Sequence, residues 1–440
     1  MSGRTQTRRP WRASRNPVLR AALLGVTVAL LLALPASGYG KTDARSSAKK
    51  SQLEVFSWWT GGGEAHGLQA LIKIWNKQHP GTPFKNETVA GGAGSNAKAV
   101  LAQRLAAHKP PDSFQGHAGA ELLDYIKAGQ VESIDFIYKK YGFNKIMPAQ
   151  LIKQITYKGH LYSVPVNIHR ANILWYNPAT LRKAEISGAP KSWSEFISDL
   201  KKAKDAKLIP LAVGEQWTQK HLLETVMIAT LGPSGWASLW KKGGNWNGAG
   251  VKTALNRYKE LLAYTNSDSA SLTWQDASKL VADGKAAFNI MGDWADGYFR
   301  VDLKKKPSSG YNWAAVPGTN GVYDWLSDSF TLAKGAPHRA AAVQWLGFLG
   351  SKKAQDTFNP LKGSIPARKD ANPKLYDTYL KWALKQWKSD KLAGSLTHGV
   401  VASNAWNTDI DTALGLFLQN KNVGNFQSAL VSAAKKRSGT

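Results

Sequence analysis

Residues 53–81 read LEVFSWWTGGGEAHGLQALIKIWNKQHPG, and this stretch carries three structural signals in succession. The short apolar run from Leu53 to Trp58 is typical of a buried strand. After three glycines, apolar residues recur at helical spacing from Leu68 to Trp75, and Pro80-Gly81 ends the pattern. The order strand, loop, helix predicts the first unit of an α/β sheet.

Two further units of this kind follow directly. The strand-like run 84–89 leads through Gly91-Gly92-Ala93-Gly94 into a helical pattern at 96–107, and the run 112–115 leads into a helical pattern at 120–128. Successive strand-helix units predict a largely parallel sheet with helices on its faces, and ligands of such sheets lie at the carboxyl ends of the strands. Those ends carry Trp58-Trp59, Gly91-Gly92 and Gln115-Gly116-His117.

The second half of the chain reads similarly without repeating the first. Strands are expected at 164–166, 209–213 and 286–291, and helices at 193–206 and 336–349. No Pro/Ser-rich linker separates the two halves. We therefore expect two α/β lobes joined by several crossings of the chain, rather than two tandem domains.

The first forty residues follow a different pattern. Six arginines, Arg8-Arg9 among them, precede an apolar run from Ala21 to Leu34, and the small residues Pro35-Ala36-Ser37-Gly38 come next. The run is shorter than the roughly 20 apolar residues of a membrane-spanning helix, so residues 1–40 are predicted to be a removed signal peptide, with a retained membrane anchor as the alternative. Arg8-Arg9 suggests a twin-arginine signal, but its distance from the apolar run favours ordinary secretion.

Composition excludes several classes of protein. The chain has no cysteine, which removes disulfides, thiolate metal sites, a cysteine nucleophile and a lipidated cysteine, and favours the periplasm. The net charge is +28, and +22 without the first forty residues, which hold six arginines and no acid. Basic clusters such as Lys201-Lys202 and Lys304-Lys305-Lys306 are short and dispersed, and no groove-reading motif is present, so nucleic acid is not an expected partner.

Sequence motifs of known catalytic, cofactor-binding and metal-binding sites are mostly absent. The sequence has no phosphate loop, dinucleotide fingerprint, HExxH, GxSxG or calcium loop, so no metal and no cofactor is expected. The glycine turn at 91–94 could hold an anion at a helix start, but this signal is weak by itself and an ordinary strand-to-helix turn is the favoured interpretation. Carboxylates such as Glu64 and Asp328 could meet in space, which leaves glycoside hydrolysis open.

Tryptophan is the distinctive residue: the chain has 18, and several stand beside polar residues at predicted loop or strand ends. Examples are Trp58-Trp59, Trp217 after Gly214-Glu215-Gln216, Trp274-Gln275-Asp276 and Gly292-Asp293-Trp294. A sugar ring presents apolar C–H faces and a rim of hydroxyls, so its site needs flat aromatic surfaces with polar groups around the edge. Packing in the core is the alternative for each tryptophan taken singly.

The chain resembles the carbohydrate-specific extracellular solute-binding proteins of ABC importers, and among them the glucose-type receptors, over essentially the whole mature chain. The resemblance rests on these segments: Phe56-Ser57-Trp58-Trp59, Gly91-Gly92-Ala93-Gly94, Gln115-Gly116-His117-Ala118-Gly119, residues 164–170, residues 286–294, Leu326-Ser327-Asp328-Ser329-Phe330 and residues 359–364. It implies a two-lobe periplasmic-binding-protein fold of type II, each lobe a mixed, mainly parallel sheet flanked by helices. It places the first lobe at 41–166 plus 329–365 and the second at 167–328 plus 366–440, with hinge crossings near Val166-Asn167, Asp328-Ser329 and Ile365-Pro366.

The resemblance also implies a ligand-binding set of eight residues and no catalytic residue. One lobe would contribute Trp58, Trp59, Glu64 and His117, and the other lobe and the crossings would contribute Trp274, Asp328, Lys362 and His398. The indoles would border the sugar, the carboxylates would accept hydrogen bonds from hydroxyls, and lysine and the histidines would contact hydroxyl oxygens. Three glycines separate Thr60 from Glu64, which makes this loop one residue longer than is usual in the family. The longer loop puts in doubt whether Glu64 extends as far as the ligand.

The function implied is that of a monomeric periplasmic receptor. It would bind a glucose-like hexose between the lobes, close by hinge motion and deliver the sugar to the permease of an ABC importer. A receptor for a disaccharide, a secreted glycoside-cleaving enzyme and a surface adhesion or scaffold protein are the alternatives.

Overall fold

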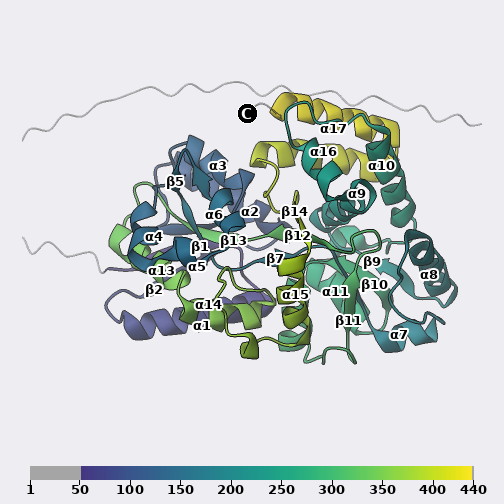
Figure 1. Cartoon of the computed structure of the whole chain (residues 1–440), viewed down its shortest axis with the longest axis horizontal. Helices are drawn as coiled ribbons and strands as arrows, with labels where there is room; N and C mark the ends of the chain where they lie inside the picture. Colours follow the sequence, from purple (N-terminus) through teal and green to yellow (C-terminus); the bar gives the residue numbers. More distant parts are fainter. Residues whose placement is uncertain (1–50, 439–440) are drawn as a thin grey trace, which may run out of the picture. The chain divides into compact units, whose positions relative to one another are not determined.

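The computed structural model describes residues 51–438, so the signal peptide expected at 1–40 lies outside the described residues. Within this range the secondary-structure elements form two groups, each built on its own sheets (Figure 1). No helix in this part of the chain is long and apolar enough to cross a membrane.

The first group is built on a five-stranded sheet with the order β2-β1-β3-β13-β6. Strands β1, β2 and β3 run parallel, as the strand-helix units predict, whereas β13 and β6 join antiparallel. The strands are β1 Leu53–Ser57, β2 Phe84–Thr88, β3 Ser113–His117, β6 Ser163–Pro165 and β13 Asp328–Leu332, with a separate hairpin of β4 Thr156–Tyr157 and β5 His160–Leu161.

Helices from both ends of the sequence surround this sheet. In Figure 1 the purple and blue N-terminal helices lie beside the green α13 and α14, and α1 packs along α14. The helices are α1 Gly62–Gln78, α2 Ser95–Ala106, α3 Ala120–Lys127, α4 Asp135–Tyr141, α5 Phe143–Ile146, α6 Ala149–Gln154, α13 Arg339–Leu349 and α14 Lys352–Lys362, and the short turn η1 Gly92–Gly94 precedes α2.

The second group contains two sheets, with the orders β11-β8-β10-β9 and β14-β12-β7. Each has one parallel pair, β10 with β9 and β12 with β14, and its other pairs are antiparallel. The strands are β7 His169–Arg170, β8 Ile173–Tyr176, β9 Ile209–Ala212, β10 Ala286–Met291, β11 Asn312–Ala315, β12 Val322–Leu326 and β14 Lys391–Gly394. The sheets are therefore more mixed than the strand-helix units alone predict.

The helices of the second group include the longest of the described chain, α9, whose helical geometry is interrupted at Gly232 before Pro233. A proline ring removes one helical hydrogen bond, which accounts for the kink. The helices are α7 Pro178–Lys183, α8 Trp193–Asp205, α9 Gln216–Leu239, α10 Ala249–Leu262, α11 Trp274–Ala282, α12 Trp294–Gly297, α15 Thr378–Ser389, α16 Asn404–Asn420 and α17 Val423–Arg437, with the short 3₁₀ helices η2 Ser269–Ser271 and η4 Pro373–Leu375 and the π-helix η3 Tyr298–Asp302.

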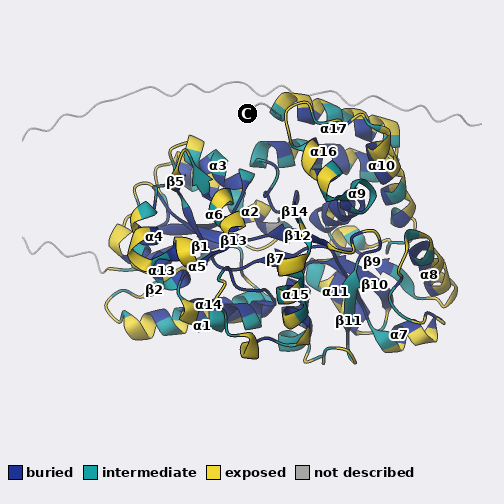
Figure 2. Ribbon diagram, in the orientation of Figure 1, coloured by how far each residue is buried: buried dark blue, intermediate teal, exposed yellow. Residues whose placement is uncertain are grey.

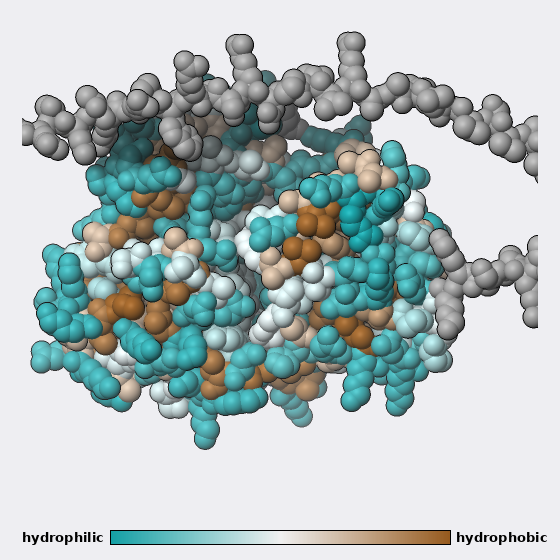
Figure 3. Space-filling model, turned by 180° about the vertical axis from the view of Figure 1, so that it is seen from behind, coloured by the Kyte–Doolittle hydropathy of each residue, from teal (hydrophilic) through white to brown (hydrophobic). Residues whose placement is uncertain are grey.

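Each group has its own apolar core. Figure 2 shows buried residues along the strands and the inner helix faces, and exposed residues on the outer helix faces. Trp75, Phe330 and Trp345 belong to the core of the first group, and Phe196, Trp236 and Phe288 to a core of the second. On the face seen in Figure 3, apolar groups form separate patches among hydrophilic side chains.

The chain passes between the two groups at three places, and hydrogen bonds tie these passages together. The backbone N–H of Val166, just after β6, donates to the carbonyl of Asp328 at 2.9 Å. Ile168 and Ile365 exchange two backbone hydrogen bonds of 2.7 and 3.1 Å. The three passages therefore form one compact connection beneath the cavity described next.

Candidate functional site

Side chains from both groups line a cavity of about 190 Å³. Seven of the eight predicted site residues line it: Trp58, Glu64, His117, Trp274, Asp328, Lys362 and His398. The remaining lining residues are Thr60, Ala90, Gly91, Gly92, Gly94, His169, Glu215, Trp217, Thr273, Gln275, Trp294 and Leu326. Residues far apart in the sequence thus converge as the resemblance implied.

Trp59 is the predicted site residue that the structure places elsewhere. Its side chain is buried in the first group's core, where its ring centroid lies 4.7 Å from that of Phe358 and 5.3 Å from that of Phe330. Successive residues of an extended segment point to opposite sides, so Trp58 and Trp59 cannot both face the same cavity. Trp58 faces the cavity, and Trp59 fills the core.

Trp58 is held in place from several sides. Its ring lies 5.1 Å from the His117 ring, and the Lys98 ammonium lies 5.4 Å from its centroid. Gly94 has a φ of +91°, and a Cβ at this position would lie 2.7 Å from the indole. A residue with a side chain would both strain the turn and displace the ring, which explains the requirement for glycine here.

Three indoles of the second group line the cavity as well: Trp217, Trp274 and Trp294. Trp294 is 7% exposed, and its ring lies 5.1 Å from that of His398 and 6.4 Å from that of Trp274. The indole N–H of Trp217 donates to Glu215 at 2.8 Å. Each group therefore offers apolar aromatic surface with polar atoms close by.

Glu64 reaches the cavity despite the longer glycine loop. Its carboxylate accepts a hydrogen bond of 2.8 Å from Lys362 Nζ, which lies 298 residues further along the chain. A Cβ on Gly63 would lie 2.1 Å from the Leu361 carbonyl, so glycine allows α1 to begin directly against α14. Burial raises the pKa of Glu64, and the charge of Lys362 opposes that rise.

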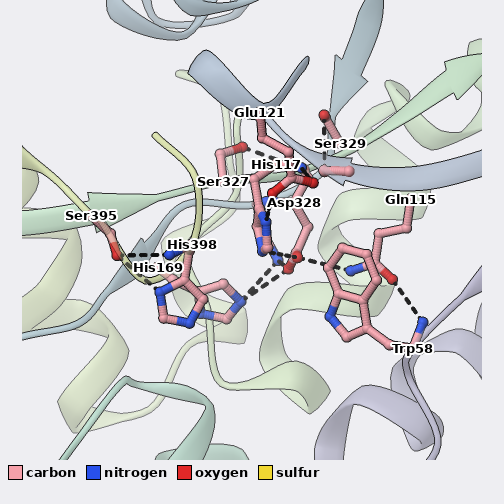
Figure 4. A network of polar contacts seen from close by, with 12 residues as sticks. Trp58, Gln115, His117, Glu121, His169, Ser327, Asp328, Ser329, Ser395 and His398 are labelled. Atoms are coloured by element: carbon pink, nitrogen blue, oxygen red, sulfur yellow. Dashed lines mark hydrogen bonds and ion pairs between the residues drawn. The ribbon is translucent and has the colours of Figure 1, made fainter. Parts of the chain in front are cut away.

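Asp328 stands at the centre of a polar network between the groups (Figure 4). Its oxygens accept hydrogen bonds from Gln115 Nε2 at 2.9 Å and Asn167 Nδ2 at 2.7 Å, and His169 Nε2 lies at 3.3 Å. Burial alone would raise its pKa, but the bond to His169 and the charge of Lys362 lower it well below the ordinary value. Asp328 is thus a fixed anion that faces the cavity.

Two of the cavity histidines are oriented by carboxylates that do not line it. His117 Nδ1 lies 2.9 Å from Glu121 Oε2, and Lys98 Nζ lies 2.7 Å from the same oxygen. Burial would raise the pKa of Glu121, but Lys98 and His117 lower it to about 2. Because this carboxylate can only accept, Nδ1 of His117 carries the proton it donates.

His169 is oriented in the same way by Asp293. Its Nδ1 is in hydrogen-bond contact with Asp293 Oδ1, and its Nε2 points to Asp328. Burial would lower the pKa of His169, but the Asp293 carboxylate raises it overall. Since a carboxylate lies at each ring nitrogen, the charged form of His169 is favoured.

His398 is oriented by a hydroxyl instead. Its Nδ1 lies 2.9 Å from Ser395 Oγ, and that hydroxyl donates to Glu224 Oε1 at 2.8 Å. The serine hydroxyl therefore uses its proton in the bond to the carboxylate. The serine oxygen can then only accept from His398, so Nδ1 of His398 carries a proton and donates it to that oxygen. Burial lowers the pKa of His398 well below its ordinary value, so the ring is neutral.

The arrangement suits recognition of a ligand with apolar faces and a hydroxyl rim. Indoles from both groups supply flat apolar surface, while Glu64, Asp328 and Lys362 supply charged partners for hydroxyls. A charged partner makes a stronger hydrogen bond than a neutral one, so a few such groups can orient a small polar molecule.

Some cavity residues outside the eight predicted ones carry a signal in the sequence. Trp217 and Trp294 carry the same polar-flanked tryptophan pattern that led to Trp274, so they could have been included. His169 lies within the segment 164–170 that carries the resemblance. Thr273 and Gln275 flank Trp274 in the sequence, and no separate pattern marks them.

Comparisons with known proteins agree with this architecture. Residues 60–356 match the family model described as bacterial extracellular solute-binding protein. An uncharacterized ABC transporter extracellular-binding protein from Pyrococcus horikoshii is 36% identical over 96% of this chain and 97% of its own length. A probable sugar-binding periplasmic protein from Brucella suis biovar 1 is 32% identical over 87% of this chain and 90% of its own length. A solved chitin oligosaccharide binding protein superposes with a TM-score of 0.78 at 19% identity, over 89% of this chain and 100% of its own.

Proposed function

Because the chain belongs to the bacterial extracellular solute-binding protein family, we propose that it is the exported sugar-binding receptor of an ABC importer. The observation that carries this proposal is the cavity itself, where indoles from both groups surround Glu64, Asp328 and Lys362. The similarity to a sugar-binding periplasmic protein supports the same class of ligand. The partners in this proposal are a small sugar and the importer's membrane permease, and the receptor acts as a monomer in the periplasm.

We propose a glucose-like hexose as the ligand, and the size of the cavity supports one sugar ring. At roughly 10–15 Å³ for each water-sized particle, a volume of about 190 Å³ has room for about 13 to 19 of them. A hexose, with about a dozen non-hydrogen atoms, is small enough to fit this space. An oligosaccharide would need the cavity to open further, and the related oligosaccharide-binding fold makes this the alternative to test.

The energetics are compatible with so small a ligand. A micromolar dissociation constant corresponds to about 8 kcal/mol, which is about 0.7 kcal/mol per atom of a hexose and below the ~1.5 kcal/mol ceiling for small ligands. Selectivity would come from Glu64, Asp328 and the histidines, because a site built to bond a hydroxyl strongly disfavours an analogue that lacks it.

We also propose that the two groups are lobes that close on the sugar. The lobes would comprise 41–166 plus 329–365 and 167–328 plus 366–440, and the tied passages at Val166, Asp328 and Ile365 would act as the hinge. A ligand that contacts both lobes favours the closed state in proportion to its differential affinity, and the permease can recognise that state.

Isothermal titration tests this function. The chain is unfolded and refolded to remove sugar carried through purification, and then titrated with glucose, galactose, mannose, xylose, maltose and trehalose. Saturable one-to-one binding of one monosaccharide, recovered unchanged afterwards, is the expected result. Binding of maltose or trehalose alone would replace the hexose by a disaccharide, turnover of a glycoside would indicate an enzyme, and absence of binding across the panel would contradict the proposal.

A further inference from the structure

A second cluster of ligating side chains lies behind the cavity, where the first turns of α9 meet the loop that follows β14. His221 and Glu224 are three residues apart on α9, so their side chains share one helix face. His398 comes from the loop, and all three side chains are buried. One ring nitrogen of each histidine and one oxygen of Glu224 lie within 4.8 Å of one another.

His221 presents a free lone pair to this cluster. Its Nε2 lies 2.9 Å from the carbonyl oxygen of Ala171. A carbonyl only accepts, so Nε2 carries the proton and Nδ1 is the unprotonated nitrogen. Nδ1 is buried and has no hydrogen-bond partner within residues 51–438. A histidine whose other nitrogen donates to a backbone carbonyl has the orientation typical of a metal ligand.

Neither carboxyl of the cluster, Glu224 or Asp324, forms an ion-pair contact with a basic side chain of residues 51–438, although the charge of Arg170 acts on Asp324 from further away. Glu224 accepts hydrogen bonds from Ser395 Oγ at 2.8 Å and from the Thr397 N–H at 2.6 Å, but no basic side chain of the described chain forms an ion pair with it. The buried carboxyl of Asp324 lies against that of Glu224, and no donor among residues 51–438 reaches either of its oxygens.

Buried polar groups without partners are rare, and adjacent buried carboxylates without a cation are costly. Around Glu224 the orphaned atoms are Nδ1 of His221, both carboxyl oxygens of Asp324 and Oγ1 of Thr397. A single bound cation would satisfy the histidine and compensate the carboxylates at the same time. A proton shared between Asp324 and Glu224, in line with the pKa of Asp324 that burial and the Glu224 charge raise well above its ordinary value, relieves the carboxyls but leaves Nδ1 of His221 without a partner.

We propose that Nδ1 of His221, the carboxylate of Glu224 and Nε2 of His398, the ring nitrogen left unprotonated when Nδ1 donates to Ser395, bind a divalent transition-metal cation of the Zn²⁺ type, with Asp324 as a further ligand or as an outer partner. Two imidazoles and a carboxylate are a donor set that suits zinc. Zinc bonds to these atoms are about 2.0–2.2 Å long, so the donors move closer together on binding than the 4.8 Å that now bounds their separations. The site is independent of the proposed sugar function, although His398 also lines the sugar cavity.

Metal binding can be measured directly on the full chain without a histidine tag and without sugar. After treatment with a chelator, the protein is dialysed against buffered Zn²⁺, and bound metal is determined by mass spectrometry. Co²⁺ substitution gives an independent readout, because bound Co²⁺ absorbs in the visible. With no cysteine in the chain, thiolates cannot contribute to either signal. One equivalent with micromolar or tighter affinity is expected.

Two variants and a matched control assign the site. Glu224→Gln keeps the volume and one acceptor but removes the charge, and His221→Phe removes the free nitrogen; each should weaken Zn²⁺ binding by at least tenfold. His160→Ala is the control, because His160 also pairs with a carboxylate, Asp135, but at an exposed position. It should bind Zn²⁺ as the unmodified chain does. Circular dichroism verifies the fold of each variant, and Glu224→Gln remains informative if His221→Phe does not fold.

Three results would overturn the inference: no bound equivalent at 100 μM Zn²⁺, full binding by both Glu224→Gln and His221→Phe, or loss of binding in His160→Ala alone. The sugar titration does not enter this test. A chain that binds metal but no sugar leaves the inference intact, and a chain that binds sugar but no metal contradicts it alone.

Discussion

At the scale of single residues, Asp328 is held by several hydrogen bonds within the protein in addition to facing the cavity. It is 2% exposed, and it accepts hydrogen bonds from Gln115 of the first group and from Asn167 in the passage between the groups. Its own N–H donates to Asn167 Oδ1 at 2.8 Å. The carboxylate therefore links the binding cavity to the passage between the two groups.

We expect Asp328→Ala to lose sugar binding. Removing one partner from a buried hydrogen-bonded charge cluster costs about 2–5 kcal/mol of binding free energy, so the dissociation constant should rise by roughly thirtyfold to several thousandfold. The unpaired donors should also lower the free energy of unfolding by about 3 kcal/mol, while the chain still folds. Titration and urea unfolding measure the two effects, and normal affinity in a folded variant would show that the site is misplaced.

Trp58 and Trp59 allow a matched comparison of binding and packing. Trp58→Ala removes a cavity surface and should weaken sugar binding by about tenfold with little change in stability. Trp59→Ala leaves a hole in the core beside Phe330 and Phe358 and should cost about 3–5 kcal/mol of unfolding free energy. Affinity of the folded Trp59 variant should change far less. Reversed effects in titration and urea unfolding would exchange the two assignments.

These two residues also show what sequence can reveal at this scale. The sequence identifies both as bulky and close to a strand end, and the opposite directions of neighbouring side chains imply that only one can face the site. Which one does so depends on the side of the sheet that meets the second group. That contact is made by residues hundreds of positions away, so no local pattern encodes it.

At the scale of elements, a buried charge cluster joins β3, α2 and α3. Glu121 at the start of α3 holds His117 at the end of β3 and Lys98 on α2. The cluster orients a cavity histidine through groups that do not line the cavity themselves. It therefore couples the packing of three elements to the shape of the site.

This cluster predicts a loss of stability in acid. The pKa of Glu121 is about 2 in the folded chain against an ordinary value of 4.5, so its contribution to stability is complete above pH 4.5 and is lost as the pH falls towards 2. The size is a few kcal/mol. Urea unfolding between pH 6 and pH 3 should show a steeper decline for the unmodified chain than for Glu121→Gln. Parallel curves for the two proteins would exclude this role.

Elements close in sequence were predictable, and those that depend on distant segments were not. The first three strand-helix units match β1 to α3 in order and direction. Strands β13 and β6 enter the same sheet antiparallel, because they connect it to the second group. A local hydrophobic period reveals that a strand exists, but not which neighbour it pairs with.

At the scale of the whole molecule, a ligand held by both groups should stabilise both together. At a sugar concentration of 100 times Kd, linkage predicts about 2.7 kcal/mol of added stability. In calorimetry, added sugar should therefore raise the unfolding temperature of both groups in a single transition. The unfolding temperature of Asp328→Ala should not change when sugar is added. If the protein instead unfolded in two transitions and sugar raised the temperature of only one of them, the sugar would contact only one group.

The order of strands in the first sheet has a consequence for handling the gene. Strand β13, at 328–332, lies between β3 and β6, while strands at 169–326 belong to the other sheets. Neither half of the coding sequence therefore encodes any of the three larger sheets in full, and a truncation at any position between β1 and β14 separates strands that pair. Either group can be produced alone only by joining separate segments of the coding sequence. During synthesis, more than 150 residues follow β6 before β13 is available to complete the first sheet.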